Sequence, residues 1–261
     1  MLAPYLRLVR AGYLRYAAYR QAMLAGLATN VVFGLLRASV LVAVITERGP
    51  VAGYDIATAV TYVWIGQGLL ATVDLWSDRE LSRRIRTGDI VVDLGRPWDL
   101  PSALLANDLG RAGNAVIARL VPPMLVGMVF FPFRWPAHAA TWVLFVLVTA
   151  LAVVTSFGIR FLLNLSAFWL LDARGVLAVW GTAGGLLTGL VLPIAWFPPW
   201  AQAVLAWTPF PVLFQVPIDV FTERGDPAAH VARATFWAAA LFLAGRVTLT
   251  RGARRLVVQG G

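Results

Sequence analysis

The sequence contains no cysteine and no lysine, and each absence excludes a class of protein. Without cysteine there is no disulfide scaffold and no thiolate metal site. Without lysine there is no Walker-type lysine to bind phosphate, so any ATP would have to be bound by another chain. Charge is scarce as well. Only 13% of the residues are charged and 59% are hydrophobic, which excludes an ordinary soluble domain and indicates a membrane protein.

Residues that could carry out catalysis are also few. The two histidines, His138 and His230, have no partner at metal-ligand spacing, so we predict neither a metal site nor an enzyme. All 22 basic residues are arginine, and the formal net charge is +9. Such a chain could bind nucleic acid, but no recognisable binding module is present, so we do not expect that partner. The positive-inside rule for membrane proteins explains the charge better.

Apolar runs of bilayer-spanning length predict an all-α polytopic protein with six transmembrane helices. We place them at about 22–45, 56–75, 113–131, 139–163, 175–194 and 231–249. Residues 1–21 carry arginines and tyrosines at helical spacing, which predicts an interfacial helix. Residues 195–222 are hydrophobic but interrupted by prolines, which predicts short re-entrant helices on the external side. The chain is therefore predicted to be a single transmembrane domain, 1–261.

The distribution of arginine predicts that both termini are cytoplasmic. In this orientation only Arg48, Arg134, Arg224 and Arg233 lie outside, and the inverted topology would reverse the bias. Residues 250–261 become a basic cytoplasmic tail, and residues 76–113 become a cytoplasmic loop between the second and third spans. The expected location is multi-pass in a bacterial inner membrane.

The loop 76–113 has its own pattern. Ser77 and Glu80 form a capping box, and Gly88 is a natural helix stop. Residues 90–94 are mostly apolar and are expected to settle at an apolar surface. After the break at Arg96-Pro97, Asp99 is expected to start another helix. The pattern predicts a compact hairpin with its turn at residues 87–89.

This loop contains IRTGDIVVDLGRP at residues 85–97. Two weaker motifs follow, the proline-rich LPIAWFPPW and TPFP before the last span, and the ending VQGG after a basic stretch. With these motifs in this order, the sequence resembles the permeases of type 2 ATP-binding-cassette (ABC) transporters. It resembles most closely a bacterial branch whose loop reads R-x-G-[DE]-hydrophobic-x3-L-x-[RK]-P.

The resemblance implies a permease subunit of an ATP-driven exporter that moves a lipophilic or amphipathic small molecule or a lipid. Its expected partners are an ABC ATPase subunit that holds ATP and magnesium, a second identical or paralogous permease, and membrane lipids. The residues implied to contact the ATPase are Arg84, Arg86, Thr87, Gly88, Asp89, Arg96 and Pro97. The alternative for these residues is an ordinary solvated loop.

Arg37 is the most informative residue within a span. An unpaired arginine at that depth costs at least about 2.5 to 3.5 kcal/mol, so it should face a cavity, a carbonyl cluster or an acid. Asp219 and Glu223 are the best acidic candidates. Arg37 could equally contact substrate or hold the re-entrant region to the first span.

Other polar residues in the spans have two interpretations each. Trp64, Gln67 and Thr72 could line a translocation path with Arg37, or they could pack helices, with a hydrogen bond from Gln67. Asp74 and Asp78 are expected to be interface charges answered by Arg79 and Arg83. Gly181 and Gly185 form a small-x-x-x-small pair that favours close helix contact.

Two other functions remain open. A secondary transporter would use an ion gradient, but it would be expected to have an acid or a histidine at mid-membrane. An integral-membrane enzyme acting on lipids would need clustered histidine or acidic residues at an interface, and the clusters here are mainly arginine.

Overall fold

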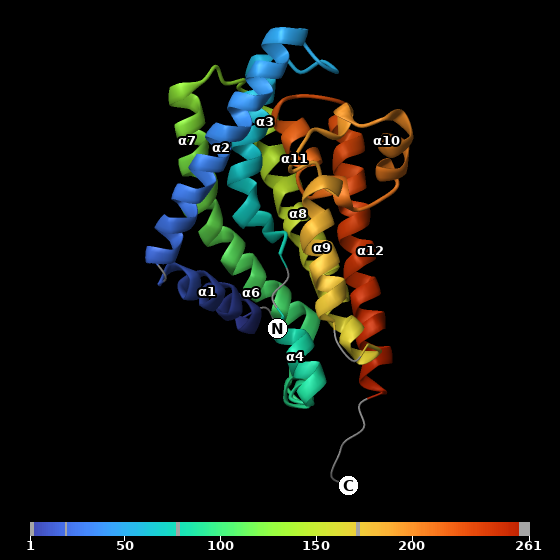
Figure 1. Cartoon of the computed structure of the whole chain (residues 1–261). Coiled ribbons are helices and arrows are strands. Elements are labelled where there is room, and N and C mark those ends of the chain that lie inside the picture. The colour runs from blue at the N-terminus through green and yellow to red at the C-terminus, as the bar shows by residue number, and fades with distance from the viewer. Residues whose placement is uncertain (1–2, 19, 77–78, 171–172, 256–261) are drawn as a thin grey trace.

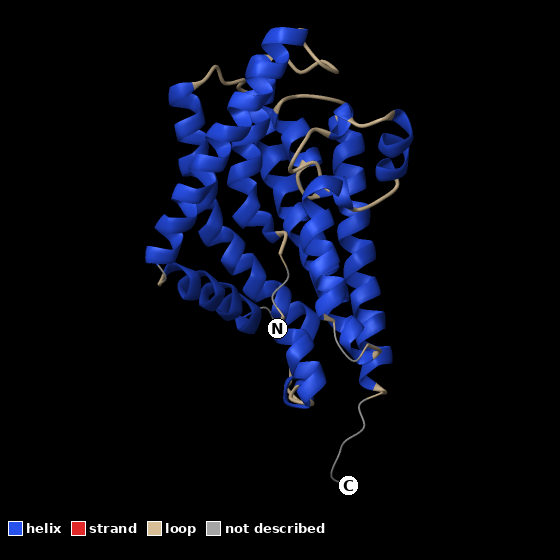
Figure 2. Cartoon of the chain, in the orientation of Figure 1, coloured by secondary structure: helices blue, strands red, loops and turns tan. Residues whose placement is uncertain are grey.

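The computed structural model describes residues 3–18, 20–76, 79–170 and 173–255. About 80% of the protein is helical, and the described residues contain no β-strand (Figure 2). The long helices run from one end of an elongated bundle to the other, and α4 (Glu80–Thr87) projects from one of these ends (Figure 1). The all-α prediction is confirmed.

Among the described residues, five helical stretches are long and apolar enough to cross a membrane, namely Met23–Arg48, Ile56–Asp74, Leu100–Phe130, Ala139–Phe168 and Pro227–Ala253. They correspond to α2 (Arg20–Arg48), α3 (Ile56–Leu69) with η1 (Leu70–Asp74), α6 (Leu100–Ala115) with η2 (Val116–Leu120) and α7 (Val121–Phe130), α8 (Ala139–Leu165) with η3 (Ser166–Phe168), and α12 (Pro227–Ala253). A multi-pass membrane protein is therefore confirmed.

The predicted fifth span is shorter than expected. Its helix, α9 (Arg174–Leu187), has 14 residues and is about 21 Å long, against roughly 30 Å of hydrocarbon. The chain then passes through a turn, η4 (Ile194–Trp196), α10 (Pro199–Ala206), η5 (Phe210–Val212) and α11 (Gln215–Phe221). Short helices are thus present where re-entrant ones were predicted. Their position relative to a membrane stays a prediction.

The third span begins earlier than predicted. The helix starts at Leu100 rather than near Gly113, and it is capped by Asp99, whose carboxylate accepts a hydrogen bond from the Ser102 backbone nitrogen at 3.1 Å. Its middle turn, η2, is π-helical. Pro122 and Pro123 follow directly and cannot donate the usual backbone hydrogen bonds to the turn before them. The predicted helix start at Asp99 is confirmed.

The N-terminal helix α1 (Ala3–Ala17) packs against α6 through two glycines. A Cβ on Gly12 would lie 2.2 Å from the carbonyl oxygen of Asn107, and a Cβ on Gly110 would lie 2.0 Å from that of Val9. Only glycine permits this approach, because any side chain would collide with backbone atoms. α1 is thereby fixed across the end of the bundle near α4 (Figure 1). An interfacial position for α1 stays a prediction.

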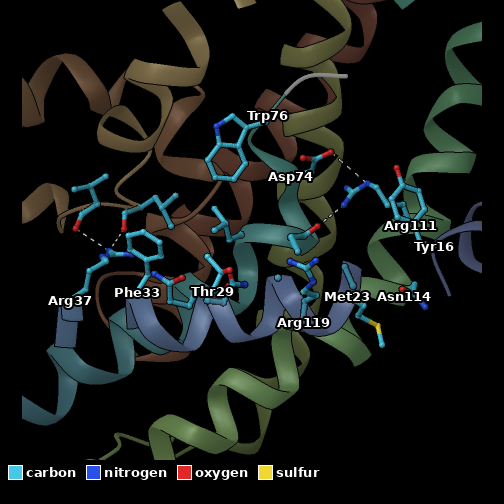
Figure 3. Close-up of a pocket in the computed structure, with 18 residues that line it drawn as sticks. Tyr16, Met23, Thr29, Phe33, Arg37, Asp74, Trp76, Arg111, Asn114 and Arg119 are labelled. Atoms are coloured by element: carbon cyan, nitrogen blue, oxygen red, sulfur yellow. Dashed lines mark hydrogen bonds and ion pairs between the residues drawn. The ribbon is translucent and has the colours of Figure 1, made fainter. Parts of the chain in front are cut away.

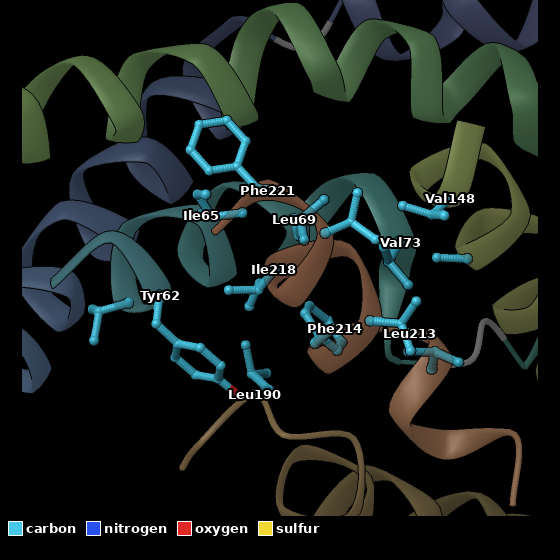
Figure 4. Close-up of a cluster of buried hydrophobic side chains, with 14 of the residues drawn as sticks. Tyr62, Ile65, Leu69, Val73, Val148, Leu190, Leu213, Phe214, Ile218 and Phe221 are labelled. Atoms are coloured by element: carbon cyan, nitrogen blue, oxygen red, sulfur yellow. The ribbon is translucent and has the colours of Figure 1, made fainter. Parts of the chain in front are cut away.

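The short segments after α9 form the centre of the main core. Phe214, Ile218 and Phe221 are fully buried and pack against Ile65 and Leu69 of α3 (Figure 4). A second apolar cluster lies at the opposite end, where α4 meets α8, α9 and α12. This second cluster determines how the α4 hairpin is attached to the bundle.

Candidate functional site

The hairpin predicted from the sequence is formed by α4 (Glu80–Thr87) and α5 (Ile90–Leu94). Gly88 ends α4 in the left-handed conformation with φ +83°, which favours glycine, so the predicted stop is confirmed. The Thr87 hydroxyl donates a hydrogen bond to Asp89 Oδ2 at 2.6 Å and braces the turn. Arg86, Thr87, Gly88 and Asp89 are all exposed at the tip, which projects beyond the bundle (Figure 1).

The beginning of α4 differs from the expectation. Arg79 occupies the N-cap position and makes no side-chain cap, while Ser77 lies outside the described residues. Glu80 instead forms an ion pair with Arg83 at 2.7 Å. The hydrogen bonds that Arg83 donates lower the pKa of the Glu80 carboxyl. Both side chains are about half exposed, so the pair contributes little stability.

Sequence reasoning missed Asp93, the acid that closes the hairpin. Its carboxylate is buried, and it lies 2.6 Å from Arg84 Nη2 and 3.9 Å from Arg96 Nε. Arg84 therefore turns inward, away from the surface implied to contact an ATPase. Arg96 and Pro97 remain exposed. A lone carboxylate inside an apolar run, with arginines on either side, was the available signal.

Of the apolar residues at 90–94, only Ile90 settles at an apolar surface of this chain; for the others this stays a prediction. Ile90 is fully buried, but Val91, Val92 and Leu94 are exposed by 47%, 63% and 36%. The reason is geometric. α5 is one short turn whose buried face is occupied by Ile90 and Asp93, so the remaining apolar side chains face outward. They form an apolar patch beside the charged tip.

The base of the hairpin is firmly attached to the bundle. The Ser82 backbone nitrogen donates a hydrogen bond to Asn164 Oδ1 on α8 at 3.0 Å. Ile85 packs in the second apolar cluster together with Phe161 of α8 and Leu249 of α12. The base of the hairpin therefore contacts the ends of two long helices, α8 and α12.

A cavity of about 890 Å³ lies between α2, α3, η1, α6, η2 and the turn after α9 (Figure 3). Of the predicted path residues, Arg37 and Gln67 line it. Trp64 and Thr72 are buried elsewhere. The indole of Trp64 sits between Gly34 and Gly127, where a Cβ would approach the ring to 2.8 and 2.3 Å. Trp64 thus packs α2 and α7 against α3.

Arg37 meets carbonyl groups rather than an acid. Its Nη2 donates hydrogen bonds to the carbonyl oxygens of Leu190 and Val191, the latter at 2.9 Å. The prediction of Asp219 or Glu223 as its partner is wrong. Asp219 accepts a hydrogen bond from Gln215, and Glu223 accepts hydrogen bonds from the backbone of His138 and the hydroxyl of Thr141. Arg37 holds the turn after α9 to α2.

Gln67 makes its contact through the backbone. Its carbonyl oxygen accepts a hydrogen bond from the Asn30 side chain at 3.2 Å, which joins α3 to α2. Thr72 likewise uses its carbonyl, which accepts a hydrogen bond from Arg111 at 3.1 Å. A role for either residue in a translocation path stays a prediction.

A buried network of two acids and two arginines borders the cavity, and sequence reasoning missed it. Asp108 lies 2.6 Å from both Arg111 and Arg160, and Asp74 lies 3.8 and 3.3 Å from the same two arginines. The predicted pairing of Asp74 with Arg79 or Arg83 is therefore wrong. Asp78 lies outside the described residues. The spacing of Asp108 and Arg111, three apart on a helix, was the signal.

The glycine pair on α9 faces side chains within the chain. A Cβ on Gly181 would lie 3.6 Å from Trp76, and one on Gly185 would lie 3.4 Å from Val191. Neither distance indicates close backbone contact with another helix of this chain. Among the described residues, no group of three or more potential metal ligands occurs.

The comparisons with known proteins decide the family. The model of a family described as "ABC-2 family transporter protein" matches residues 33–260. The chain belongs to the ABC-2 transporter family. A search of the curated proteins finds no match. As an ABC-2 permease the chain is a membrane transport subunit, and permeases of this family generally work with an ATP-binding subunit.

The hairpin and the cavity of this ABC-2 permease differ in the kind of ligand that they could bind. The hairpin offers an exposed apolar patch and a charged tip on a rigid base, which suits protein contact. The cavity offers polar and apolar walls inside the helical bundle, which suits binding of a small molecule. Asp74 of the buried network is the last residue of η1, which connects α3 at the cavity to the segment that leads to α4. The network therefore lies between the cavity and the hairpin along the chain.

Proposed function

We propose that this ABC-2 permease is the membrane subunit of an exporter driven by ATP that a separate ABC subunit hydrolyses. ATP and magnesium would be bound by that partner, and a second permease, identical or paralogous, would complete the transporter. The hairpin α4–α5 carries the proposal, because it combines an outward apolar patch with a base that packs on α8 and α12.

The proposed arrangement places the hairpin and both termini in the cytoplasm of a bacterium, with the bundle in the inner membrane. Within it, α9 and the turn after it would form a shortened fifth span, which makes six in all, and α10 and α11 would re-enter from the outside. Burial of α11 supports this arrangement, because broken helices in a membrane require cover by protein. The cargo would be a lipophilic or amphipathic molecule that enters the cavity.

The decisive experiment changes the hairpin patch without disturbing its base. Val92 is 63% exposed, so Val92→Glu should leave the fold intact while placing a charge in the proposed contact. We expect the tagged variant to capture less of the Walker-containing ATPase that co-purifies with the native chain, and to lose most vanadate-sensitive transport.

The matched control is Gly175→Glu, which adds the same charge at an exposed position with nothing within 4 Å. This control should retain full capture and transport. If Val92→Glu captures and stimulates the ATPase as well as the native chain does, the hairpin is not the contact. Transport by the purified chain alone, driven by a pH gradient, would instead favour the secondary-transporter alternative.

A further inference from the structure

The cavity has an excess of positive charge. Of the described residues that line it, three are arginine and one is aspartate. Arg111 belongs to the buried network, in which two acids balance two arginines. The other two arginines that line the cavity are Arg37, at one end, and Arg119, part-way toward the other end (Figure 3).

These two arginines lie along one face of α2. The guanidinium of Arg119 packs against Gly26, where a Cβ would lie 2.2 to 2.4 Å from three of its atoms. Gly26 and Arg37 are eleven residues apart, which is close to three full turns of helix. Two guanidinium groups are therefore presented at levels about 16 Å apart along the same wall.

Arg37 retains donors for a ligand. Both of its hydrogen bonds to the turn after α9 are donated by Nη2, so Nε and Nη1 have no partner among the described residues. A guanidinium offers five donors in a planar fork that matches carboxylate or phosphate oxygens. Positive charge within a membrane is costly unless it is compensated, and an anion in the cavity would compensate it.

The wall between the two arginines is largely apolar. Phe33, Leu70, Trp76 and Val191 line the cavity there, and Met23 lines it on the other side of Arg119 (Figure 3). A ligand with a charged head and a hydrocarbon tail could place its head at one arginine and its tail against these side chains. An anion without a tail would leave this surface in contact with water.

We propose that the cavity binds an amphiphile whose head group is anionic, a phosphate, sulfate or carboxylate on a hydrocarbon chain. This inference rests on the proposed transport function and specifies that the transported molecule is anionic. Arg119 is the binding position toward the hairpin end and Arg37 the position toward the far end. Occupation of the two positions in turn would carry the head group about 16 Å along α2.

The test measures binding without ATP or an ATPase. The full chain in phosphatidylcholine nanodiscs is equilibrated with a dansyl-labelled undecanoic acid, and empty nanodiscs are subtracted. We expect dodecyl phosphate to displace the probe, and dodecanol and dodecyltrimethylammonium to fail. Inorganic phosphate alone should also fail. Equal displacement by the cationic or neutral amphiphile, or by inorganic phosphate, would overturn the inference.

Variants locate the site. Arg119→Gln should weaken binding of dodecyl phosphate about tenfold, because a hydrogen bond to a charged group contributes at least that factor. Arg119→Lys should keep most of the affinity. Arg251→Gln, at an exposed position on α12 away from the cavity lining, is the matched control and should bind normally. Unchanged binding in Arg119→Gln would refute the assignment.

Arg37→Gln should also weaken binding about tenfold. Since Arg37 also holds the turn after α9, its variant is accepted only if it elutes as the native protein does in size-exclusion chromatography, and otherwise Arg119 decides. The two proposals fail separately. Loss of anion selectivity overturns the head-group inference alone, whereas a normal Val92→Glu variant overturns the coupling role alone.

Discussion

Replacement of Asp108 by asparagine tests how the buried network holds the bundle together. The carboxylate of Asp108 contacts Arg111 on its own helix and Arg160 on α8, each at 2.6 Å. Asparagine has nearly the same shape but no charge, so two buried arginines would share Asp74 alone. That acid lies farther away, at 3.8 and 3.3 Å.

The magnitude follows from the burial of the group. Removal of one partner from a buried ion pair costs about 3 to 5 kcal/mol, because an uncompensated charge remains. Asp74 still faces both arginines, so we expect the lower part of this range, about 3 kcal/mol of unfolding free energy. The measurement is denaturation by sodium dodecyl sulfate in mixed micelles, followed by circular dichroism.

Two further variants make the test specific. Glu80→Gln removes an acid from an exposed pair and should leave the unfolding curve unchanged. The double variant Asp108→Asn with Arg160→Leu restores the charge balance, so it should recover part of the loss. If Asp108→Asn unfolds as Glu80→Gln does, or if the double variant shows the simple sum of two losses, the network does not join α6 to α8.

Two other predictions concern packing and pH. Gly127→Ala should destabilise the protein by about 1 to 3 kcal/mol in the same assay, because its Cβ would approach the Trp64 ring to 2.3 Å; unchanged stability would mean that the indole can move aside. Hydrogen bonds from the Thr141 hydroxyl and the His138 backbone lower the pKa of Glu223 to about 2. Because the folded pKa lies below the ordinary value near 4.5, this stabilisation is complete above that pH and is lost as the pH falls toward 2. Native protein should therefore lose more stability than Glu223→Gln between pH 6 and pH 3, and parallel loss would refute the shift.

The hairpin shows what local sequence can and cannot predict. Gly88 and Asp99 were predicted correctly because a left-handed turn and an N-cap depend on residues within a few positions. Asp93 was missed because its burial depends on how α5 folds back on α4. The outward direction of Val92 follows from the same tertiary arrangement.

The spans also include features that local sequence predicts and features that it does not. Long apolar runs predict α2, α8 and α12, since length and hydropathy are properties of the sequence alone. The start of the third span was misplaced because Asp108 and Arg111 look too polar for a bundle interior. Asp108 pairs with Arg111 and also with Arg160, which is 52 residues away, and this removes most of that cost. No single stretch of sequence contains this information.

For Arg37 the sequence predicted the need for a partner but not which residues provide it. Its depth predicted a partner, and a carbonyl cluster was among the alternatives. The identity of that cluster depends on α9 ending at Leu187, after which the carbonyls of Leu190 and Val191 face α2. The early end of the helix could not be predicted from a run that stays apolar to residue 194.

The position of Trp64 between two glycines has a mechanical consequence for the cavity. Because the indole fills the space between α2, α3 and α7, those three helices should move as one block. The facing wall is a turn that Arg37 holds by hydrogen bonds. Any change in the width of the cavity should therefore come from displacement of that turn, while the helical block keeps its shape and sets the smallest size of the chamber.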